Sequence, residues 1–217
     1  MPVIRLLPAL IMLLLASVAH AGGVDDLESF YDKVDTLTTQ FEQVQTDEQG
    51  NTLQQASGTF WLSRPDRFRW QYKKPYEQII LSDGDTFKFY DLDLAQVTIR
   101  NIDATLRATP ALLLTGGAAL EDAFDVADGG NRDGMSWVRL TPRADDTDFQ
   151  EVRLGLKDQI PAVMELDDSL GQTTRIRFTD TQVNPDLAAS RFELDIPDDV
   201  EVVDGRGMNE NGRRRLQ

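Results

Sequence analysis

Among the residue types that could catalyse a reaction or bind a metal, this chain is rich in carboxylates and nearly lacks the others. The 217 residues include one histidine, no cysteine, and 37 aspartates and glutamates against 22 lysines and arginines. Thiol nucleophiles, histidine-based triads and most zinc or copper sites are therefore excluded. The formal net charge of −15 also argues against nucleic acid as a partner, because phosphates require a basic surface.

Paired carboxylates are the remaining candidates for acid–base chemistry. They lie in turn-like, solvated sequence that suits surface solubility better than general-acid work: Asp91/Asp93, Asp145/Asp146 and Asp167/Asp168. The loop DGGNRDG, residues 128–134, lacks the ligand spacing and the bidentate glutamate of a calcium loop, and we interpret it as a hairpin turn. No glycine-rich phosphate loop or nucleophile-elbow serine is present. We expect no enzymatic activity, no metal site and no cofactor.

The most distinctive polar residue is an arginine at the end of an apolar row. The segment GTFWLSRPDRFRWQY, residues 58–72, has the pattern of two aromatic strands joined by a tight turn. Strand alternation puts Arg64 on the face of Phe60 and Leu62, and it puts Phe68, Trp70 and Tyr72 on one face of the next strand. Arg64 could simply pair with Asp66 at the surface, which would contribute little. Alternatively, its five donors could bind backbone carbonyls at the end of a covering helix.

The elements that would position this arginine are one amphipathic helix, a β-meander and one apolar insert. Apolar residues recur at helical spacing over residues 24–37, and from residue 38 short β-type runs alternate with turn sequences. Residues 172–179 alternate cleanly, which predicts a sheet with one dry and one wet face. The insert at residues 102–117 predicts a short helix with Thr109 as N-cap, Pro110 at its first position and Gly116–Gly117 as its stop. A helix without a polar face must be buried in a core or must cover an apolar surface.

The apolar stripe along the meander is either an ordinary sheet core or the wall of a ligand cavity. Packed cores are the rule, but this chain has few helical residues to cover so large an apolar face. The residues of the stripe are Phe60, Leu62, Phe68, Trp70, Ile79, Leu81, Phe87 and Phe89.

The two ends of the chain differ from the rest. Residues 1–21 have one early cation, Arg5, an apolar run too short to span a bilayer comfortably, and an Ala-His-Ala end, which together predict a cleaved signal peptide. Cleavage would remove 21 of 217 residues, leave 196, and change the charge from −15 to −16 by removing Arg5. Because no cysteine is available for a lipid anchor, we expect a soluble periplasmic protein. Residues 205–217, with Arg213 to Arg215, are predicted to be a disordered polar and basic tail.

Four stretches together resemble the outer-membrane lipoprotein carrier protein (LolA) family, in order over about residues 27–204. They are GTFWLSRPDRFRW, KKPYEQIILSDGDTFKFYDLDLAQVTIR, TPALLLTG and RFELDIPDDVEVVD. The resemblance implies a mainly β fold with short helices, an unclosed antiparallel β-barrel whose concave apolar face is capped by a helical lid. Residues 22–204 would form this single carrier domain.

The resemblance also implies roles for residues and partners. Arg64, immediately before Pro65, would latch the lid by bonding carbonyls of the lid helices, Asp25–Leu37 and Pro110–Thr115. The apolar stripe would be the cavity for acyl chains, with Phe68 and Trp70 near its mouth. Lid residues would be Leu27, Phe30, Tyr31, Val34, Pro110, Leu112, Leu113 and Leu114. Such a monomeric carrier takes lipoproteins from the ATP-driven inner-membrane release complex (LolCDE) to the outer-membrane receptor (LolB), without stable membrane insertion.

A second hypothesis uses the same half-barrel differently. The protein could be a periplasmic sensor or interaction module that recognises lipidated envelope proteins without transferring them. A transfer assay separates the two hypotheses, because only a carrier delivers its cargo. An enzyme acting on lipids or peptidoglycan ranks third, since suitable catalytic residues are lacking.

Overall fold

The computed structural model describes residues 22–101, 110–115, 120, 123–144, 147 and 149–206, and over this part of the chain twelve strands form one sheet. The strands are β1 (Thr36–Thr46), β2 (Thr52–Ser63), β3 (Arg67–Lys74), β4 (Gln78–Asp83), β5 (Thr86–Asp91), β6 (Gln96–Asn101), β7 (Phe124–Arg132), β8 (Met135–Pro142), β9 (Phe149–Lys157), β10 (Ile160–Asp168), β11 (Thr173–Val183) and β12 (Glu201–Asp204). The helices are α1 (Gly23–Lys33), α3 (Pro110–Thr115) and the 3-10 turn η2 (Ala189–Phe192).

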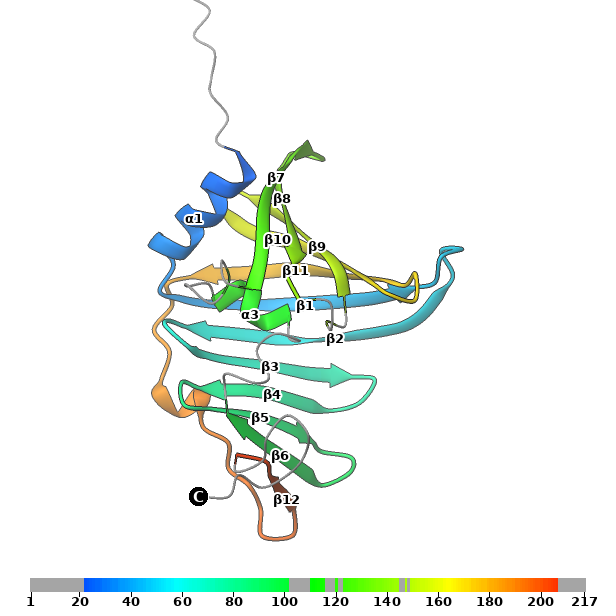
Figure 1. The fold of residues 1–217 in the computed structure, drawn as a ribbon. Helices are drawn as coiled ribbons and strands as arrows, with labels where there is room; N and C mark the ends of the chain where they lie inside the picture. The colour runs from blue at the N-terminus through cyan, green and yellow to red at the C-terminus, as the bar shows by residue number, and fades with distance from the viewer. Residues whose placement is uncertain are drawn as a thin grey trace, which may run out of the picture.

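The sheet is strongly curved but does not close. Its strand order is β12-β6-β5-β4-β3-β2-β1-β11-β10-β9-β8-β7, so β12 and β7 are separate edges. Figure 1 shows β1 to β6 stacked across the lower part of the molecule and β7 to β10 turned upright above them, with α1 and α3 on the concave side. Neighbouring strands are antiparallel except β12, which pairs with β6 in parallel. The predicted unclosed, mainly antiparallel half-barrel is confirmed.

The first helix is shorter than predicted. It ends at Lys33, whereas the pattern predicted helix to Leu37, a residue that instead lies in β1. Two features explain the early end. The threonine-rich start of β1 favours extended backbone, and the Asn184 side-chain oxygen accepts the backbone N–H groups of Asp35 (2.8 Å) and Thr36 (3.2 Å). The second helix has the predicted bounds, while the expected cap Thr109 and stop Gly116–Gly117 lie outside the described residues.

Turns fall where the sequence predicted them, with one change in extent. Within residues 128–134 strand β7 continues to Arg132, and only Asp133 and Gly134 form the turn. Both have positive φ, 56° and 72°, which is the backbone of a two-residue hairpin turn and favours glycine or aspartate. The interpretation as a hairpin rather than a calcium loop is therefore confirmed.

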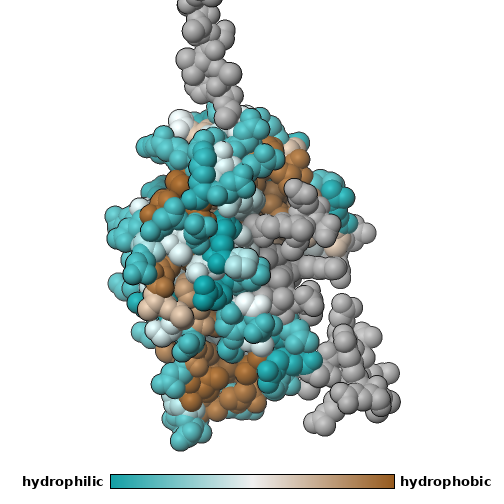
Figure 2. Space-filling view, turned by 90° about the vertical axis from the view of Figure 1, so that its left-hand side faces the viewer, coloured by the Kyte–Doolittle hydropathy of each residue, from teal (hydrophilic) through white to brown (hydrophobic). Residues whose placement is uncertain are grey.

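The core lies on the concave side of the sheet, called the inner face below. Alternation along β11 is as predicted, with Ile176 and Phe178 buried and Arg175 and Arg177 exposed. In the view of Figure 2 the surface is largely hydrophilic, and an apolar patch lies low in the view, at the level of β6 and β12. The edge strand β12 exposes Val202 and Val203.

The chain ends add two points. The predicted signal peptide and residues 207–217, including Arg213 to Arg215, lie outside the described residues. The first two residues of the predicted tail contact β6: Gly205 N–H donates to Ile99 O (2.8 Å), and the Arg206 carbonyl accepts a bond from the Asn101 side chain (3.1 Å). Among the described residues, no helix has the length and apolarity needed to cross a bilayer.

Candidate functional site: the covered inner face

The inner face is a wall of aromatic and aliphatic side chains arranged in rows across the strands. Paired residues in neighbouring strands share a face, so the register gives the rows directly. The first row contains Leu37, Leu62, Phe68 and Phe87, the second Thr39, Phe60, Trp70, Ile80 and Phe89, and the third Phe41, Gly58, Tyr72 and Gln78. Ring centroids of Phe41 and Phe60 lie 4.9 and 5.0 Å from that of Trp70. The wall is thus continuous from β1 to β5.

Six of the eight predicted wall residues lie on this inner face. Phe60, Leu62, Phe68, Trp70 and Phe87 are buried in the main hydrophobic cluster, and Phe89 is partly buried against it.

The prediction for Ile79 and Leu81 is wrong as to the face. Ile79 pairs with Gln71 and Leu81 with Arg69, so both point to the outer face, and Ile80, opposite Trp70, points inward. They are nevertheless buried, because η2 packs on β3 and β4 from outside. Three consecutive apolar residues in β4 made the alternation ambiguous, and only the strand pairing decides it.

Within the described part of the chain, two helices cover the inner face. Helix α1 contacts β7 to β10, and α3 contacts β2 and β3. Of the predicted lid residues, Leu27, Phe30, Val34, Leu113 and Leu114 are buried in the same hydrophobic cluster as the wall, and Tyr31 is partly buried against it. Pro110 and Leu112 belong to α3, and their side chains fall outside the described part of the chain.

Arg64 joins the ends of both helices to the end of the first strand pair. Its Nε donates to Val34 O (2.6 Å), its Nη2 to Leu114 O (3.2 Å) and its Nη1 to Thr115 O. The guanidinium also lies over the Phe30 ring, with Cζ 5.0 Å from the centroid. The last carbonyls of a helix have no partner within it, and a planar group with five donors can bind several of them at once.

Electrostatics around Arg64 follow from burial. Desolvation lowers the pKa of Arg64, while Tyr31 and Asp35 raise it, and a guanidinium remains charged regardless. Tyr31 adds a second link, because its hydroxyl donates to Leu113 O (2.7 Å). Burial raises the pKa of Tyr31, and the nearby Arg64 lowers it in part. The sequence predicted Tyr31 as a packing residue and gave no sign of this hydrogen bond.

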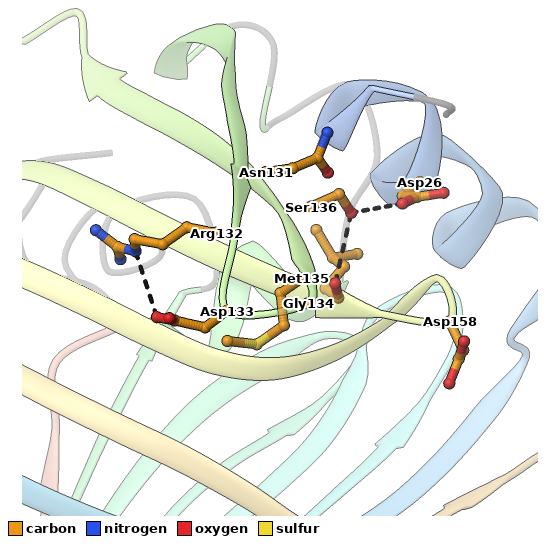
Figure 3. Close-up of a pocket in the computed structure, with 9 residues that line it drawn as sticks. Asp26, Asn131, Arg132, Asp133, Gly134, Met135, Ser136 and Asp158 are labelled. Atoms are coloured by element: carbon orange, nitrogen blue, oxygen red, sulfur yellow. Dashed lines mark hydrogen bonds and ion pairs between the residues drawn. The ribbon is translucent and has the colours of Figure 1, made fainter. Parts of the chain in front are cut away.

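The N-terminal half of α1 is fixed by different contacts, at the pocket of about 530 Å³ in Figure 3. There the Ser136 hydroxyl on β8 bonds the Asp26 carboxylate, as the dashed line shows. Gly23 N–H donates to the Asp128 carboxylate (3.3 Å). A Cβ at Gly23 would lie 2.1 Å from Trp137 O, so only glycine allows this close approach. One end of α1 is anchored to the sheet, and the other is held by Arg64.

Two grooves border the covered face. One of about 580 Å³ lies beside α1, with Leu27, Tyr31, Leu120 and Phe124 among its lining residues. The other, of about 230 Å³, lies beyond the third row, at the opposite end from Arg64. Its lining includes Gln43, Ala56, Tyr72, Lys74 and Ile80.

Three of the carboxylates considered for chemistry accept hydrogen bonds within the fold: Asp91, Asp167 and Asp168. Arg153 binds the Asp167 carboxylate (2.7 Å) and also the nearly buried Glu165 (3.0 Å) on the outer face. Burial raises the pKa of Asp167, but the bonds from Arg153 and Thr173 outweigh it and lower that pKa. Asp145 and Asp146 lie outside the described residues. Among the described residues, no three acidic or histidine side chains are placed to hold a metal ion.

The fold and the site together define a half-barrel whose apolar inner face is covered by two helices that Arg64 joins through backbone carbonyls. The family model for "Outer membrane lipoprotein carrier protein LolA" matches residues 32–195. A curated outer-membrane lipoprotein carrier protein of Cupriavidus taiwanensis is 42% identical over 198 residues, 90% of this chain and 94% of its own. Another, of Methylococcus capsulatus, is 41% identical over 208 residues, 95% of this chain and 100% of its own.

The chain therefore belongs to the outer-membrane lipoprotein carrier protein LolA family. Its fold is also similar to that of an uncharacterized conserved protein from Thermus thermophilus, seen in a crystal structure. The TM-score is 0.55 at 13% identity, covering 84% of this chain and 96% of that one. This second likeness concerns the fold alone.

Proposed function

We propose that the protein is a periplasmic, non-enzymatic carrier that holds the acyl chains of lipoproteins on its inner face. The observation that carries the proposal is the contact set of Arg64, which holds α1 and α3 over an apolar wall through three backbone carbonyls. Because the other end of α1 is anchored to β7 and β8, breaking the Arg64 bonds frees α3 and the C-terminal end of α1 to move off the wall. Arg64 is the latch, α1 and α3 are the lid, and the wall residues on the inner face receive the chains.

The energetics of such a carrier follow from burial. Each methylene transferred from water to an apolar site contributes about 0.8 kcal/mol, so acyl chains favour the inner face strongly. The empty protein must therefore gain stability by closing, or its apolar wall would stay exposed. Hydrogen bonds that involve a charged group contribute about 1.5 to 3 kcal/mol each. A latch of this size favours the closed state and can still be opened by a ligand or a partner.

We propose partners of the kind that the resemblance implies. The cargo is lipoprotein, released by the ATP-driven inner-membrane complex (LolCDE) and delivered to the outer-membrane receptor (LolB). The energy for loading comes from the release complex. We further propose export by the signal peptide of residues 1–21 and action as a monomer in the periplasm.

The proposal is tested by reconstituted transfer. Inner-membrane vesicles that contain the release complex and an acylated lipoprotein are incubated with the purified protein and ATP. We expect a soluble complex of protein and lipoprotein, which then donates the lipoprotein to vesicles bearing the receptor. A reaction without ATP is the control. Lipoprotein that remains in the donor membrane would refute the proposal, and binding without delivery would favour a recognition module.

A further inference from the structure

A buried hydrogen-bond donor in the second row of the inner face has no partner among the described residues. The Trp70 side chain is 2% exposed, and its Nε1 finds no acceptor in that part of the chain. The rings of Phe41, Phe60 and Phe178 surround it, with centroids 4.9, 5.0 and 6.2 Å away, and they hold the indole in place. A buried donor without an acceptor costs about 1 to 3 kcal/mol. The site therefore favours a ligand that supplies an acceptor.

The polar edge of this indole lies near the smaller groove. Tyr72, in the next row, has its ring centroid 6.4 Å from that of Trp70, and its hydroxyl donates to Gln43 Oε1 (3.1 Å). Burial raises the pKa of Tyr72 to about 12, and the neighbouring Trp70 indole lowers it in part. The indole N–H therefore lies close to the Tyr72 hydroxyl. The two groups do not meet the geometry of a hydrogen bond, so the hydroxyl does not satisfy the donor. Tyr72, Gln43 and the partner of Trp70 across the strands, Ile80, all line the groove of about 230 Å³.

We propose that Trp70 Nε1 and the Gln43 carboxamide form a binding site for the carbonyl oxygen of an acyl ester or amide. The inference rests on the proposed function, because it assumes that acyl chains occupy the inner face. The available donors are uncharged and lie against aromatic rings. A neutral carbonyl suits them better than a carboxylate, which would lose its hydration without a paired charge.

The position of this site gives the bound chain a direction. Arg67 marks the Arg64 end of the inner face, because it lies opposite the end of β2, and Tyr72 is five residues further along β3. At about 3.3 Å per residue, the two ends are roughly 16 Å apart. A carbonyl at Trp70 places the chain along the first and second rows toward Arg64. The polar part of the ligand then leaves through the groove beside Gln43 and Lys74. Lid latch and head-group site are thus at opposite ends of the inner face.

Indole N–H signals provide a test that needs no variant for its main result. The chain has three tryptophans, Trp61, Trp70 and Trp137. Trp137 is an internal reference, because its Nε1 already donates to Arg132 O (3.1 Å). With ¹⁵N-labelled tryptophan, we expect the Trp70 proton signal to move downfield when methyl dodecanoate is added and not when tridecane is added. The Trp137 signal should stay in place with both.

Affinity measurements complete the test. Trp70→Phe keeps an aromatic ring and removes the donor, so it should weaken methyl dodecanoate binding by about 2- to 10-fold and leave tridecane binding within about twofold. Trp61→Phe is the matched control, since Trp61 pairs with Arg69 and belongs to the outer face. A Trp70 signal that responds identically to ester and alkane would overturn the inference while leaving the carrier function intact. If neither compound binds, the proposed function itself fails.

Acyl esters occur in both lipoproteins and phospholipids, so the same signal is followed with two larger probes. A synthetic diacylated cysteinyl peptide and a short-chain phosphatidylglycerol present the same ester carbonyls on different head groups. A shift with the peptide alone supports a site for lipoprotein, and a shift with both supports a site for acyl esters in general. No shift with either overturns the assignment.

Discussion

Replacing Arg64 by methionine removes the guanidinium of the proposed latch while keeping an unbranched, flexible apolar stem. The three hydrogen bonds to Val34, Leu114 and Thr115 are lost together. Bonds of a charged donor contribute about 1.5 to 3 kcal/mol each, but the three share one guanidinium and are not additive. We take about 2 to 4 kcal/mol as the loss of closed-state stability. At about 1.36 kcal/mol per tenfold change, the open population should rise roughly 30- to 1,000-fold.

Thiol labelling measures that population directly, because the chain has no cysteine of its own. Leu62→Cys introduces one thiol on the inner face, at a side chain with 0% exposure next to the latch. Its labelling rate is proportional to the open fraction when opening is fast relative to the reaction. We expect Arg64→Met to increase the rate roughly 30- to 1,000-fold in the Leu62→Cys background. Arg64→Lys should give a smaller increase than Arg64→Met, because the ammonium keeps a charged donor. The rate should still rise above that of the parent, because an ammonium cannot reproduce the planar fork of donors.

The matched control is Arg67→Met. Arg67 lies at the other side of the same turn, but its guanidinium is over Phe192, on the outer face, with Cζ 5.6 Å from the centroid. This variant should leave the labelling rate within about threefold of the parent. Global unfolding, which would also expose the thiol, is excluded by comparing the urea midpoints of the Leu62→Cys parent and its three arginine variants. Equal labelling rates for Arg64→Met and its parent would refute the assignment of Arg64 as the latch.

Three further predictions follow from the register and the contacts. Ile80→Asn, on the inner face, should weaken binding of an apolar fluorescent probe at least about fivefold. Ile79→Asn, on the outer face, should lower stability without weakening probe binding. Equal effects of the two variants on binding would contradict the register. Burial raises the pKa of Asp83, but bonds from Lys88 and the backbone outweigh it and lower that pKa to about 2. Asp83→Asn should therefore reduce the unfolding free energy by about 1 to 2 kcal/mol at pH 7. That difference is present above pH 4 and should disappear as the pH falls toward 2, measured by urea unfolding; a constant difference would refute it. Gly23→Ala should weaken the anchored end of α1 and raise the hydrogen-exchange rate of that helix without changing β10, and unchanged exchange in α1 would count against the anchor.

The fold was predictable from the sequence because its signals are local. Turn sequences mark the hairpins, and the alternation in β11 identifies the dry face. Helix α3 carries its own start signal in Pro110. The end of α1 was not predictable in the same way, because Asn184, about 150 residues later, bonds the backbone at the helix–strand junction. The parallel pairing of β12 with β6 likewise depends on a contact between distant segments.

The candidate site was predictable in part, and the missing part is again nonlocal. An arginine after an apolar row suggested bonds to helix carbonyls, which the structure contains. The faces of Ile79 and Ile80 required the pairing of β3 with β4. The bond from Tyr31 to Leu113, and the lack of an acceptor for Trp70 Nε1 among the described residues, depend on how side chains pack in three dimensions. No periodicity in the sequence reports such contacts.

The chemistry of the proposed latch bears on how it would be opened. Arg64 donates to the backbone carbonyls of Val34, at the C-cap of α1, and of Leu114 in α3, and these acceptors do not titrate, unlike the carboxylate of an ion pair. The latch contacts themselves should therefore be nearly independent of pH between about 5 and 9. A change in acidity is consequently a poor trigger, and opening has to come from a ligand or partner that binds the open state more tightly than the closed one. A latch built on carbonyls thus makes opening depend on binding, as a carrier that must stay closed when empty requires.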